Sequence, residues 1–391
     1  MYQFAHINTA REIIETYDGK EPFQHHLKSY LKLIKKAGSR DRKSIGHLCY
    51  TYLRIGRSMD KATFDERLAT ALFLCEESPN PYLQVLYDRW NHSEMIRLPI
   101  EEKVSVVKET VPDFMIDDVF PFNLSLSEGI DRKHFVYSHL RQPFLYLRLR
   151  AADNSSIVNQ LEQSGQMIDV KEDCIALRNG TNIEELLTLN RDAVVQDKSS
   201  QGVRDFFPMT DKKERIKIWD ACAASGGKAI LLYDHYKNIE LTVTDKRSSI
   251  IHNLRQRLHE AGINDYHSFV LDLTLQSPAI RSNEYDIVLA DVPCSGSGTW
   301  SRTPEHLSTF TDSRVDDYQQ LQRSILRHIR PSLKRGGHLL YVTCSVFRKE
   351  NEENVDWLLK EFGLKVVKAS PITGYAHNAD TMYAALLLND S

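Results

Sequence analysis

Apolar and polar positions divide the chain into three stretches, and the first of them is helical. In segment 23–38, four apolar residues recur at helical spacing while four lysines share a more polar face. The apolar residues are Phe23, Leu27, Leu31 and Ile34, and the lysines are Lys28, Lys32, Lys35 and Lys36. Gly38 and Ser39 then end one helix and begin the next. Because this kind of pattern continues to about Asp117, we predict an all-helical domain over residues 1–117.

A short stretch with strand-like alternation follows. The residues FLYLRLRA at 144–151 alternate well enough for a strand, and SSIVNQLEQSG at 155–165 is typical of a short helix. This combination of one strand and one helix differs from the helical pattern before it. We therefore predict a small α/β module over residues 118–192.

From Ala193 to the end of the chain, apolar strands alternate with amphipathic helices. Strands are predicted at residues 215–220, 239–245, 266–272, 285–292, 336–344, 364–368 and 381–389. The clearest helices between them are predicted at 248–262 and 317–333. Such alternation favours a doubly wound parallel sheet, and strands this apolar suit a sheet that helices cover on both faces. We therefore predict an α/β domain over residues 193–391.

Composition and charge exclude few classes of protein. The 391 residues are 41% hydrophobic and 26% charged, which is typical of a globular protein with enough apolar residues for two or three cores. The net charge of −3 neither supports nor excludes nucleic-acid binding, because a local basic face is sufficient. No apolar run is long enough to cross a bilayer, and the first residues lack the pattern of a signal peptide. We expect a cytoplasmic monomer without a membrane partner.

The cysteines indicate neither a zinc site nor a disulfide framework. They are widely scattered and none forms a Cys-x-x-Cys pair. The six are Cys49, Cys75, Cys174, Cys222, Cys294 and Cys344. In a reducing compartment they remain thiols, so any that matter act through reactivity or packing. We expect no metal, and for the first four cysteines we expect a packing role.

The segment IWDACAASGGKAILLYD indicates a ligand-binding turn between a strand and a helix. Gly226 and Gly227 allow close approach of the backbone to a ligand, at the carboxyl edge where doubly wound sheets bind ligands. The next three strands end in Asp245, Asp272 and Asp291. A single aspartate there is most often a turn residue or a helix cap. A series of them along one edge indicates a ligand site.

The missing motifs narrow the choice of cofactor. The first turn has neither the Gly-x-Gly-x-x-Gly of dinucleotide binding nor a Walker-type phosphate loop. Asp245 is placed to accept hydrogen bonds from ribose hydroxyls, and Asp272 is placed to meet an adenine edge. S-adenosylmethionine, which carries an amino acid in place of phosphates, fits this pattern best.

Two cysteines fall at the ends of strands that we expect to be neighbours. Cys294 stands in Pro-Cys-Ser-Gly after the fourth strand, and Cys344 stands in Thr-Cys-Ser after the fifth. Carbon 5 of cytosine cannot accept a methyl group directly, but addition of a thiolate to carbon 6 makes it nucleophilic. A base must then remove the carbon 5 proton so that the thiolate can leave. One cysteine for each task fits this chemistry, with Asp291 holding the edge of the base.

These motifs resemble the Sun (Fmu/RsmB-like) family of RNA cytosine-5 methyltransferases. The resemblance rests on DACAASGGK, LADVPCSGSGT, RTPE and GGHLLYVTCSVFRKENEENV, with VVQDKSSQGV just upstream. It implies a Rossmann-like methyltransferase sheet, Cys344 as nucleophile and Cys294 as the group that assists release. It also implies cofactor contacts from the acids Asp245, Asp272 and Asp291 and from a loop. That loop comprises Cys222, Ala223, Ala224, Ser225, Gly226, Gly227 and Lys228.

The chain departs from the family pattern at three positions. Ser225 replaces the usual proline, Ala229 the usual threonine, and Val292 the usual alanine. Loss of the proline frees the loop backbone, which favours weaker cofactor binding. None of these changes removes a group that the chemistry requires.

The resemblance is weaker outside the catalytic domain. Residues 37–56 resemble part of a NusB-like helical domain, and the module around 144–151 resembles the family's small RNA-contacting domain. Arg148 and Arg150 are candidate phosphate contacts there, with solvated strand-edge charges as the alternative. The lysine face of segment 23–38 is likewise either an RNA-contacting patch or an ordinary solvated face.

Several alternatives remain at this stage. The domain organisation resembles the branch that acts on small-subunit ribosomal RNA, with transfer RNA as the other substrate. A catalytically silent RNA-binding or assembly factor on the same fold is disfavoured because both Cys294 and Cys344 are present. A DNA cytosine methyltransferase needs only the Pro-Cys cysteine, and a nicotinamide-dependent oxidoreductase is disfavoured by the first glycine turn.

Overall fold

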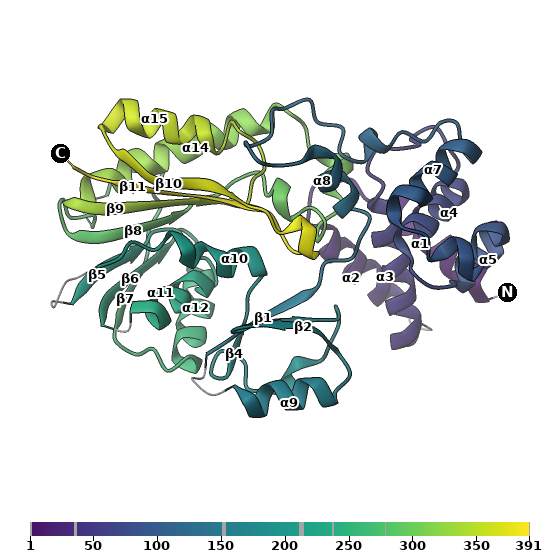
Figure 1. Cartoon of the computed structure of the whole chain (residues 1–391), viewed down its shortest axis with the longest axis horizontal. Helices are drawn as coiled ribbons and strands as arrows, with labels where there is room; N and C mark the ends of the chain where they lie inside the picture. Colours follow the sequence, from purple (N-terminus) through teal and green to yellow (C-terminus); the bar gives the residue numbers. More distant parts are fainter. Residues whose placement is uncertain are drawn as a thin grey trace. The chain divides into compact units, whose positions relative to one another are not determined.

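The chain forms two compact units, each built from more than one segment (Figure 1). The structure is a computed structural model that describes residues 2–34, 37–150, 154–210, 215–236, 238–277 and 279–390. The helical unit comprises Met1–Asn123, Asp131–Gln142 and Trp300–Thr311. The sheet unit comprises Leu124–Ile130, Pro143–Thr299 and Asp312–Ser391.

The helical unit contains helices from residues 1–117, as predicted, and further short helices from beyond residue 117. They are α1 (Tyr2–Glu15), α2 (Phe23–Leu33), α3 (Ser39–Leu53), α4 (Phe64–Cys75), α5 (Pro81–Tyr87), α6 (Ser93–Ile96), α7 (Ile100–Thr110), α8 (Arg132–Ser138) and α13 (His306–Thr309), with short 3₁₀ turns η1 (Asp88–Trp90) and η2 (Ile116–Val119). Helix α4 begins with a capping box, in which Thr63 accepts a hydrogen bond from the Glu66 amide and the Glu66 carboxylate accepts one from the Thr63 amide.

The two later segments of the helical unit are held by a buried arginine. Arg54, just after α3, is only 3% exposed, and its Nη1 donates to the carbonyl oxygens of His139, Arg141 and Ser301. The segments 131–142 and 300–311 therefore belong to this unit. The sequence boundary at residue 117 leaves both of them outside, because no local pattern announces a contact so distant along the chain.

The amphipathic pattern of α2 is confirmed where the structure describes it. Phe23, Leu27 and Leu31 are buried, whereas Lys28 and Lys32 are exposed. Lys35 and Lys36 lie outside the described residues. The exposed lysines make no ion pair with the described residues, as expected for a solvated helix face.

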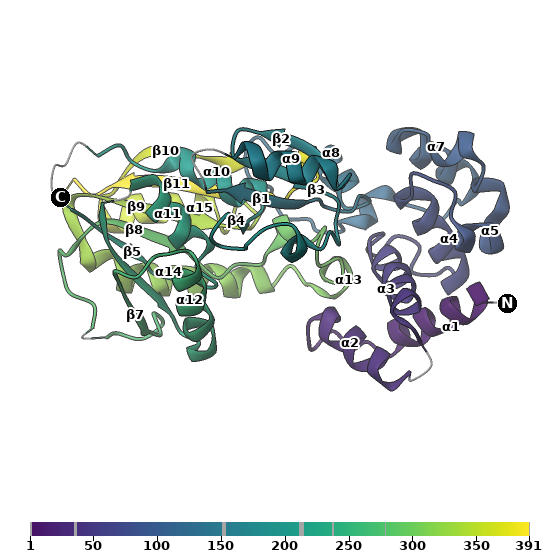
Figure 2. The ribbon, with the colours of Figure 1, turned by 90° about the horizontal axis from the view of Figure 1, so that it is seen from below.

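The predicted small module is built on a four-stranded antiparallel sheet. Its strands are β1 (Leu145–Leu149), β2 (Met167–Lys171), β3 (Cys174–Leu177) and β4 (Ala193–Val195), in the order β2-β3-β1-β4. Helix α9 (Ser155–Gln163) packs Leu161 onto the apolar face of β1 and β3 (Figure 2). Turn η3 (Ile183–Glu185) adds Ile183 to the same core. Strand β4 lies beyond the predicted boundary at residue 192 because it pairs with β1.

The large sheet has seven strands, all at predicted positions. They are β5 (Ile216–Asp220), β6 (Ile239–Asp245), β7 (Tyr266–Val270), β8 (Tyr285–Asp291), β9 (Leu333–Thr343), β10 (Lys365–Ile372) and β11 (Met382–Leu388), in the order β10-β11-β9-β8-β5-β6-β7. The five strands from β9 to β7 are parallel to their neighbours, but β11 is antiparallel to both β9 and β10. The expectation of a wholly parallel sheet is therefore wrong at this end of the sheet.

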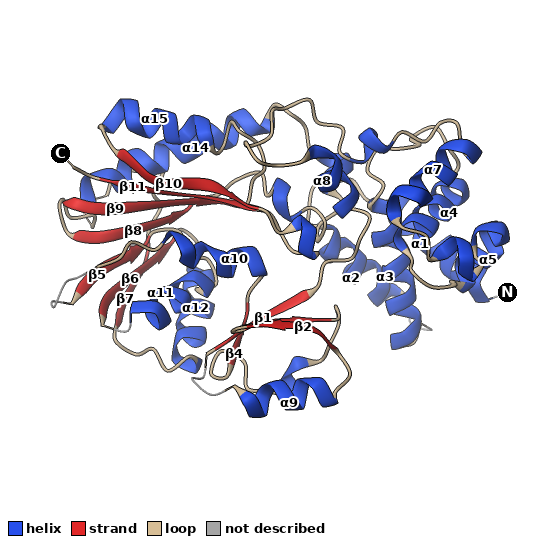
Figure 3. Ribbon diagram, in the orientation of Figure 1, coloured by secondary structure: helices blue, strands red, loops and turns tan. Residues whose placement is uncertain are grey.

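Helices cover both faces of the large sheet (Figure 3). They are α10 (Lys198–Gly202), α11 (Gly227–Tyr236), α12 (Ser248–Glu260), α14 (Arg314–Ile329) and α15 (Glu352–Phe362), with 3₁₀ turns η4 (Val203–Phe206), η5 (Ser297–Thr299), η6 (Arg330–Ser332) and η7 (Tyr375–His377). On one face, α11 and α12 pack Ile230 and Leu254 against the strands. On the other face, α14 and α15 contribute Ile325 and Leu358. The predicted doubly wound α/β class, Rossmann-like in its parallel part, is confirmed.

None of the helices in the described part of the chain is both long enough and apolar enough to span a bilayer.

Candidate active site

A cavity of about 380 Å³ lies at the carboxyl edge of the five parallel strands. Its wall is formed by the loops that follow β5, β6, β7, β8 and β9, together with Leu321 and Ile325 of α14. The lining residues from these loops are Ala221, Cys222, Ala224, Asp245, Lys246, Arg247, Leu271, Asp272, Leu273, Thr274, Asp291, Val292, Pro293, Cys294 and Cys344. All three predicted acids and both predicted cysteines therefore meet at one cavity.

The turn after β5 is tightly wound. Ala224 and Gly226 both have positive φ, 45° and 83°. At Gly226 a side chain would be strained by this φ and would also lie 3.3 Å from Leu254. The Ala223 amide donates to the Thr244 carbonyl, which fastens the turn to the end of β6.

Only part of the predicted cofactor loop faces the cavity. Of its seven residues, Cys222 and Ala224 line the wall. The other five, which shape or flank the turn, do not: Ala223, Ser225, Gly226, Gly227 and Lys228. We therefore expect direct contact with a ligand from the first two and support from the rest.

Ser225, which stands where the family usually has proline, is held from outside the loop. Arg257 of α12 donates from Nη1 to the Ser225 hydroxyl at 2.9 Å and to its carbonyl oxygen at 3.2 Å. The same guanidinium donates to the carbonyl of Val195 and to Asn190. This contact restrains a backbone that the missing proline leaves free.

Asp245 and Asp272 each close a turn with the residue two positions later. Asp245 accepts from the amide and the guanidinium of Arg247, and Asp272 accepts from the amide and the hydroxyl of Thr274. Burial raises the pKa of Asp245, but the bonds from Arg247 outweigh it and the net shift is downward. The bonds from Thr274 lower the pKa of Asp272. Both side chains are therefore carboxylates, which can accept hydrogen bonds from a ligand.

Asp220, the last residue of β5, directly precedes the cavity-lining residues Ala221 and Cys222 but is not part of the cavity wall, and it was not predicted from the sequence. It is 1% exposed, and neither oxygen has a hydrogen-bond partner of normal geometry among the described residues. Burial, followed by the negative charge of Asp291, raises its pKa to about 8, against smaller opposing effects of Lys228 and the Cys222 amide. The rule that found the other acids, an aspartate at the end of a strand, applies equally to Asp220.

The two predicted cysteines are in direct contact. The Sγ atoms of Cys294 and Cys344 are 3.2 Å apart, and the Cys344 amide lies 3.3 Å from the Cys294 sulfur. The pairing of β8 with β9 produces this contact, as the sequence predicts. The hydrogen bond with Cys344, and then burial, raise the pKa of Cys294 well above its usual range. Cys294 is therefore a thiol near neutral pH.

A lysine and an aspartate lie beside the cysteine pair. Lys228 donates from Nζ to Asp291 at 2.6 Å. Burial lowers the pKa of Lys228, but the Asp291 carboxylate and the sulfur of Cys344 raise it, so the net shift is upward. Lys228 is therefore a cation that interacts with both the Asp291 carboxylate and the sulfur of Cys344.

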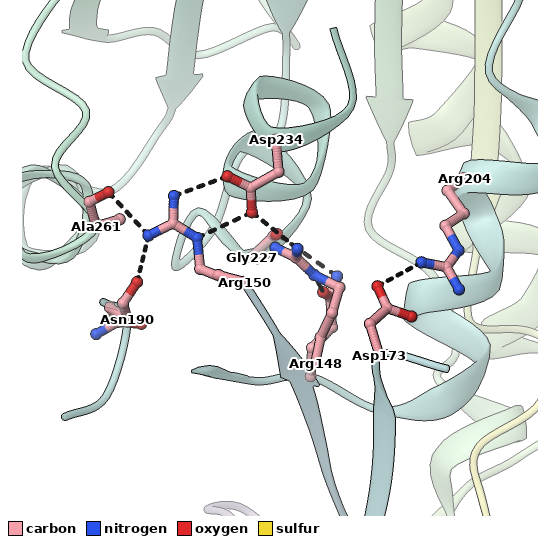
Figure 4. A network of polar contacts seen from close by, with 9 residues as sticks. Arg148, Arg150, Asp173, Asn190, Arg204, Gly227, Asp234 and Ala261 are labelled. Atoms are coloured by element: carbon pink, nitrogen blue, oxygen red, sulfur yellow. Dashed lines mark hydrogen bonds and ion pairs between the residues drawn. The ribbon is translucent and has the colours of Figure 1, made fainter. Parts of the chain in front are cut away.

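Arg148 and Arg150, the candidate phosphate contacts, are occupied inside the sheet unit (Figure 4). Arg148 is 3% exposed and donates to Asp234 at 2.8 Å, and Arg150 donates from two nitrogens to the same carboxylate. Arg150 also donates to the carbonyls of Asn190 and Ala261. Both sequence interpretations, phosphate contact and solvated charge, are wrong, because the partly buried Asp234 of α11 provides a counter-charge for the two guanidinium groups.

The residues of the cavity fit a nucleoside cofactor with an amino acid tail. Carboxylates at the ends of β6 and β7 suit hydroxyl and amino donors, and Asp220 provides an unsatisfied buried carboxyl near the first turn. The described residues contain no group of three His, Cys, Asp or Glu side chains able to hold a metal ion. The fold is that of the Rossmann-like methyltransferase sheet, and the residues of the cavity fit the cofactor of that class.

Comparison with known proteins identifies the family. Residues 208–387 match the family of the 16S rRNA methyltransferase RsmB/F. The probable ribosomal RNA small subunit methyltransferase B of Bacillus subtilis is 30% identical over 230 residues, which cover 57% of this chain and 51% of that protein. The mouse tRNA (cytosine(72)-C(5))-methyltransferase NSUN6 is 35% identical over 167 residues, 39% of this chain and 34% of that protein. Residues 208–387 therefore match the family that the sequence motifs resemble, and the predicted resemblance is confirmed.

The fold extends beyond the matched residues. The crystal structure of PH0851 covers 99% of this chain and 98% of its own, with a TM-score of 0.70 at 20% identity. The structure of NSun6 from Pyrococcus horikoshii with SFG covers 64% of this chain and 91% of its own, with a TM-score of 0.53 at 14% identity. The chain spans about half the length, or less, of the curated relatives named above.

Proposed function

We propose that this protein transfers a methyl group from S-adenosylmethionine to carbon 5 of a cytosine in RNA. The observation that carries the proposal is the contact of two thiols, 3.2 Å apart, at the wall of a cavity lined by strand-end carboxylates. Membership of residues 208–387 in an RNA methyltransferase family supports the substrate class. S-adenosylmethionine is the cofactor that the acids and the glycine turn favour.

Cys344 is the nucleophile in this proposal. Its sulfur adds to carbon 6 of the cytosine, the carbon 5–carbon 6 double bond opens, and carbon 5 becomes nucleophilic. Lys228 holds Asp291 beside this sulfur. Asp291, held by Lys228, accepts a hydrogen bond from the exocyclic amino group and fixes the base during addition. When bound, S-adenosylmethionine supplies an electrophilic methyl group, which carbon 5 takes.

Cys294 assists the release step. After methylation, carbon 5 still carries its proton, which must leave as the double bond re-forms and the carbon–sulfur bond to Cys344 breaks. The Cys294 thiol gives its proton to solvent, and the resulting thiolate takes the carbon 5 proton, so that Cys294 ends as a thiol and Cys344 leaves as a thiolate. The surroundings that raise the pKa of Cys294 make this thiolate a strong base. Its contact with Cys344 places it next to the adduct.

Small-subunit ribosomal RNA is the substrate that we favour. The name of the matched family refers to 16S rRNA, and the name of the Bacillus subtilis relative refers to RNA of the small ribosomal subunit. Transfer RNA is the alternative, favoured by the NSUN6 relatives. In either RNA the target base must be unpaired or flipped, because carbon 6 is inaccessible within a stacked helix.

The test is a covalent trap. Cys294→Ala protein is incubated with total RNA and S-adenosylmethionine and then denatured, and we expect a protein–RNA adduct because addition proceeds while release stalls. Sequencing of the captured RNA identifies the substrate. Cys344→Ala should abolish methyl transfer while leaving cofactor affinity unchanged.

The matched control for the trap is the double variant Cys294→Ala, Cys344→Ala, which should capture nothing. Capture that persists in the double variant would show that Cys344 is not the nucleophile. Full activity of both single variants would refute the two-cysteine mechanism. No capture by a cofactor-binding Cys294→Ala protein, with RNA still bound reversibly, would favour the silent RNA-binding factor.

A further inference from the structure

A cluster of buried polar side chains packs against the loops that carry the two cysteines. At its centre is Glu350, whose exposed fraction is 0%. The residue lies between β9 and α15 and does not line the cavity. Burying a carboxylate completely costs free energy unless hydrogen bonds or a counter-charge replace its contacts with water.

Glu350 accepts hydrogen bonds from both cysteine loops. Its Oε1 accepts from the amide of Ser295, next to Cys294, at 2.9 Å. Its Oε2 accepts from the hydroxyl of Ser295 and from the hydroxyl of Ser345, next to Cys344. One carboxylate therefore joins the immediate neighbours of both sulfurs.

The position of Glu350 is itself fixed. Gln322 of α14 donates to its Oε1 at 2.9 Å, and the hydroxyl of Tyr341 on β9 donates to its main-chain oxygen. Asn354 of α15 donates to the same oxygen. Glu350 is thus anchored through its carboxylate to α14 and through its main-chain oxygen to β9 and α15, and a shift of either cysteine loop would break bonds to this fixed residue.

All the donors to the Glu350 carboxylate are neutral. Within the described residues, no cation forms an ion pair with it. Burial raises its pKa, while its four hydrogen bonds act in the opposite direction. Its negative charge is also one cause of the raised pKa of Cys294, after the contact with Cys344 and burial.

We propose that Glu350 is a positioning residue that joins the loops of Cys294 and Cys344 and sets the distance between their sulfur atoms. The proposal deepens the two-cysteine mechanism and rests on it for its consequence in methyl transfer. The positioning itself is a property of the free protein and can be measured without RNA or cofactor.

A backbone contact elsewhere makes the proposal testable by substitution. The Gly298 amide donates to the Cys344 carbonyl at 2.9 Å, so the two loops remain joined when the carboxylate is removed. Glu350→Ala should therefore loosen the sulfurs while the fold is retained. Glu350→Gln keeps an acceptor for the Ser295 amide, and its amide group can donate to hydroxyls that reorient. We expect Gln to preserve the geometry that Ala loses.

The experiment measures how fast the two thiols join in the full-length protein. Diamide oxidises the pair, so that each cysteine loses its hydrogen, a sulfur–sulfur bond forms, and the diazene is reduced to a hydrazine. Peptide mass spectrometry reports the Cys294–Cys344 disulfide. We expect rapid formation in the wild type and in Glu350→Gln, and formation slower by about tenfold or more in Glu350→Ala, because disulfide geometry is demanding.

Three measurements keep the result interpretable. Glu353→Gln is the matched control, because Glu353 lies three residues further on, in the first turn of α15, and contacts Gln319 instead of a cysteine loop, so it should behave as wild type. Cofactor affinity should stay unchanged in Glu350→Ala, since Glu350 is outside the cavity wall. If Glu350→Ala does not fold, Ser345→Ala removes one of the joining bonds and should slow disulfide formation by a smaller factor.

The proposal and the mechanism fail in different ways. Disulfide formation at wild-type speed in folded Glu350→Ala would overturn the positioning role, whatever the activity. Slow disulfide formation in Glu350→Ala together with no RNA capture by Cys294→Ala would leave the positioning role intact and refute the proposed function. Where methyl transfer is found, Glu350→Ala should lose about 100-fold in kcat, the loss expected from a misplacement of about 1 Å, and Glu350→Gln should restore most of it.

Discussion

Two carboxylates in the sheet unit, the partly buried Asp234 and the fully buried Glu350, are satisfied in opposite ways. Asp234, on α11, accepts hydrogen bonds from two arginines of the small sheet, so cations neutralise its charge (Figure 4). Glu350, beside the cysteines, accepts hydrogen bonds from an amide, two hydroxyls and a side-chain amide, none of them charged. Asp234 is therefore paired with cations, whereas Glu350 receives hydrogen bonds from neutral protein groups alone.

The difference separates a structural site from a functional one. The ion pair of Asp234 with Arg148 fastens the small sheet to α11. Because the carboxylate is paired with a cation, its electrostatic effect on other groups is small. Burial raises the pKa of Glu350 in spite of its four hydrogen bonds, and its carboxylate is one cause of the raised pKa of the neighbouring Cys294. Asp220 extends the series, because its oxygens have neither cation nor hydrogen-bond donor of normal geometry among the described residues. A buried carboxylate without a cation or hydrogen-bond donors is costly to the fold, so it is a stronger candidate for a functional role than a paired one.

The largest effect is expected at Asp220, in the pH dependence of stability. Its pKa of about 8 in the folded protein lies above the ordinary value of 3.8, so the folded state keeps a proton that the unfolded state loses. Stability from this group is complete below pH 4 and is lost as the pH rises toward 8, by up to about 1.4 kcal/mol per pH unit.

Asp220→Asn should remove this slope. Urea unfolding of both proteins without cofactor, from pH 5 to pH 8, checks it, because other titrating groups cancel in the difference. Parallel curves for the two proteins would show that Asp220 titrates normally.

At Asp234 we expect the next largest loss. Asp234→Asn leaves two buried guanidinium groups facing one neutral amide, and breaking such a pair from one side costs about 3 kcal/mol. The free energy of unfolding from urea titration measures it. Asp192→Asn is the control, because its partner Arg191 is 69% exposed and the change should be within error. A loss no larger than that of the control would show that Asp234 does not fasten the small sheet.

Glu350→Gln should change stability far less than Asp234→Asn. No cation is left unpaired, and removing a buried charge offsets the altered hydrogen bonds, so we expect a change within about 1 kcal/mol. Both amide variants are unfolded in the same urea titration. Equal losses of unfolding free energy in Asp234→Asn and Glu350→Gln would show that pairing with a cation makes no difference to the stability contributed by these carboxylates.

The smallest effect is expected at the cofactor loop. Ser225→Ala removes the hydroxyl contact with Arg257 but keeps the contact with the carbonyl, so the loss should be about threefold in cofactor Kd, roughly 0.6 kcal/mol. Calorimetric titration with S-adenosylmethionine measures it. Ser249→Ala, on the exposed side of α12, should leave Kd unchanged. An unchanged Kd in Ser225→Ala would show that Arg257 does not compensate for the missing proline.

Sequence reasoning predicted the large sheet because its strands follow local rules. Apolar runs separated by amphipathic helices leave few arrangements, and the carboxyl ends of parallel strands must share an edge. Asp245, Asp272, Asp291, Cys294 and Cys344 were placed by that rule alone, and all five line one cavity. Asp220 obeys the same rule but was not predicted as a functional residue, because the glycine turn that follows it is the stronger local signal at that strand end.

Reasoning from local pattern failed where a partner lies far along the chain. Arg148 looks like a surface charge on a strand, yet its carboxylate is 86 residues away on α11. The antiparallel β11 has the same apolar character as a parallel strand, and only the pairing of its backbone shows its direction.

The sequence by itself determined the class of fold, the cavity edge and the identity of the two cysteines, because periodicity and strand ends are local properties. Only the tertiary structure decided how those cysteines are held and which charges are compensated. The 3.2 Å contact of the two sulfurs follows from strand pairing, but the carboxylate of Glu350 beside them follows from the packing of β9, α14 and α15. Burial and hydrogen-bond partners depend on the whole chain, and they set which of these groups is charged.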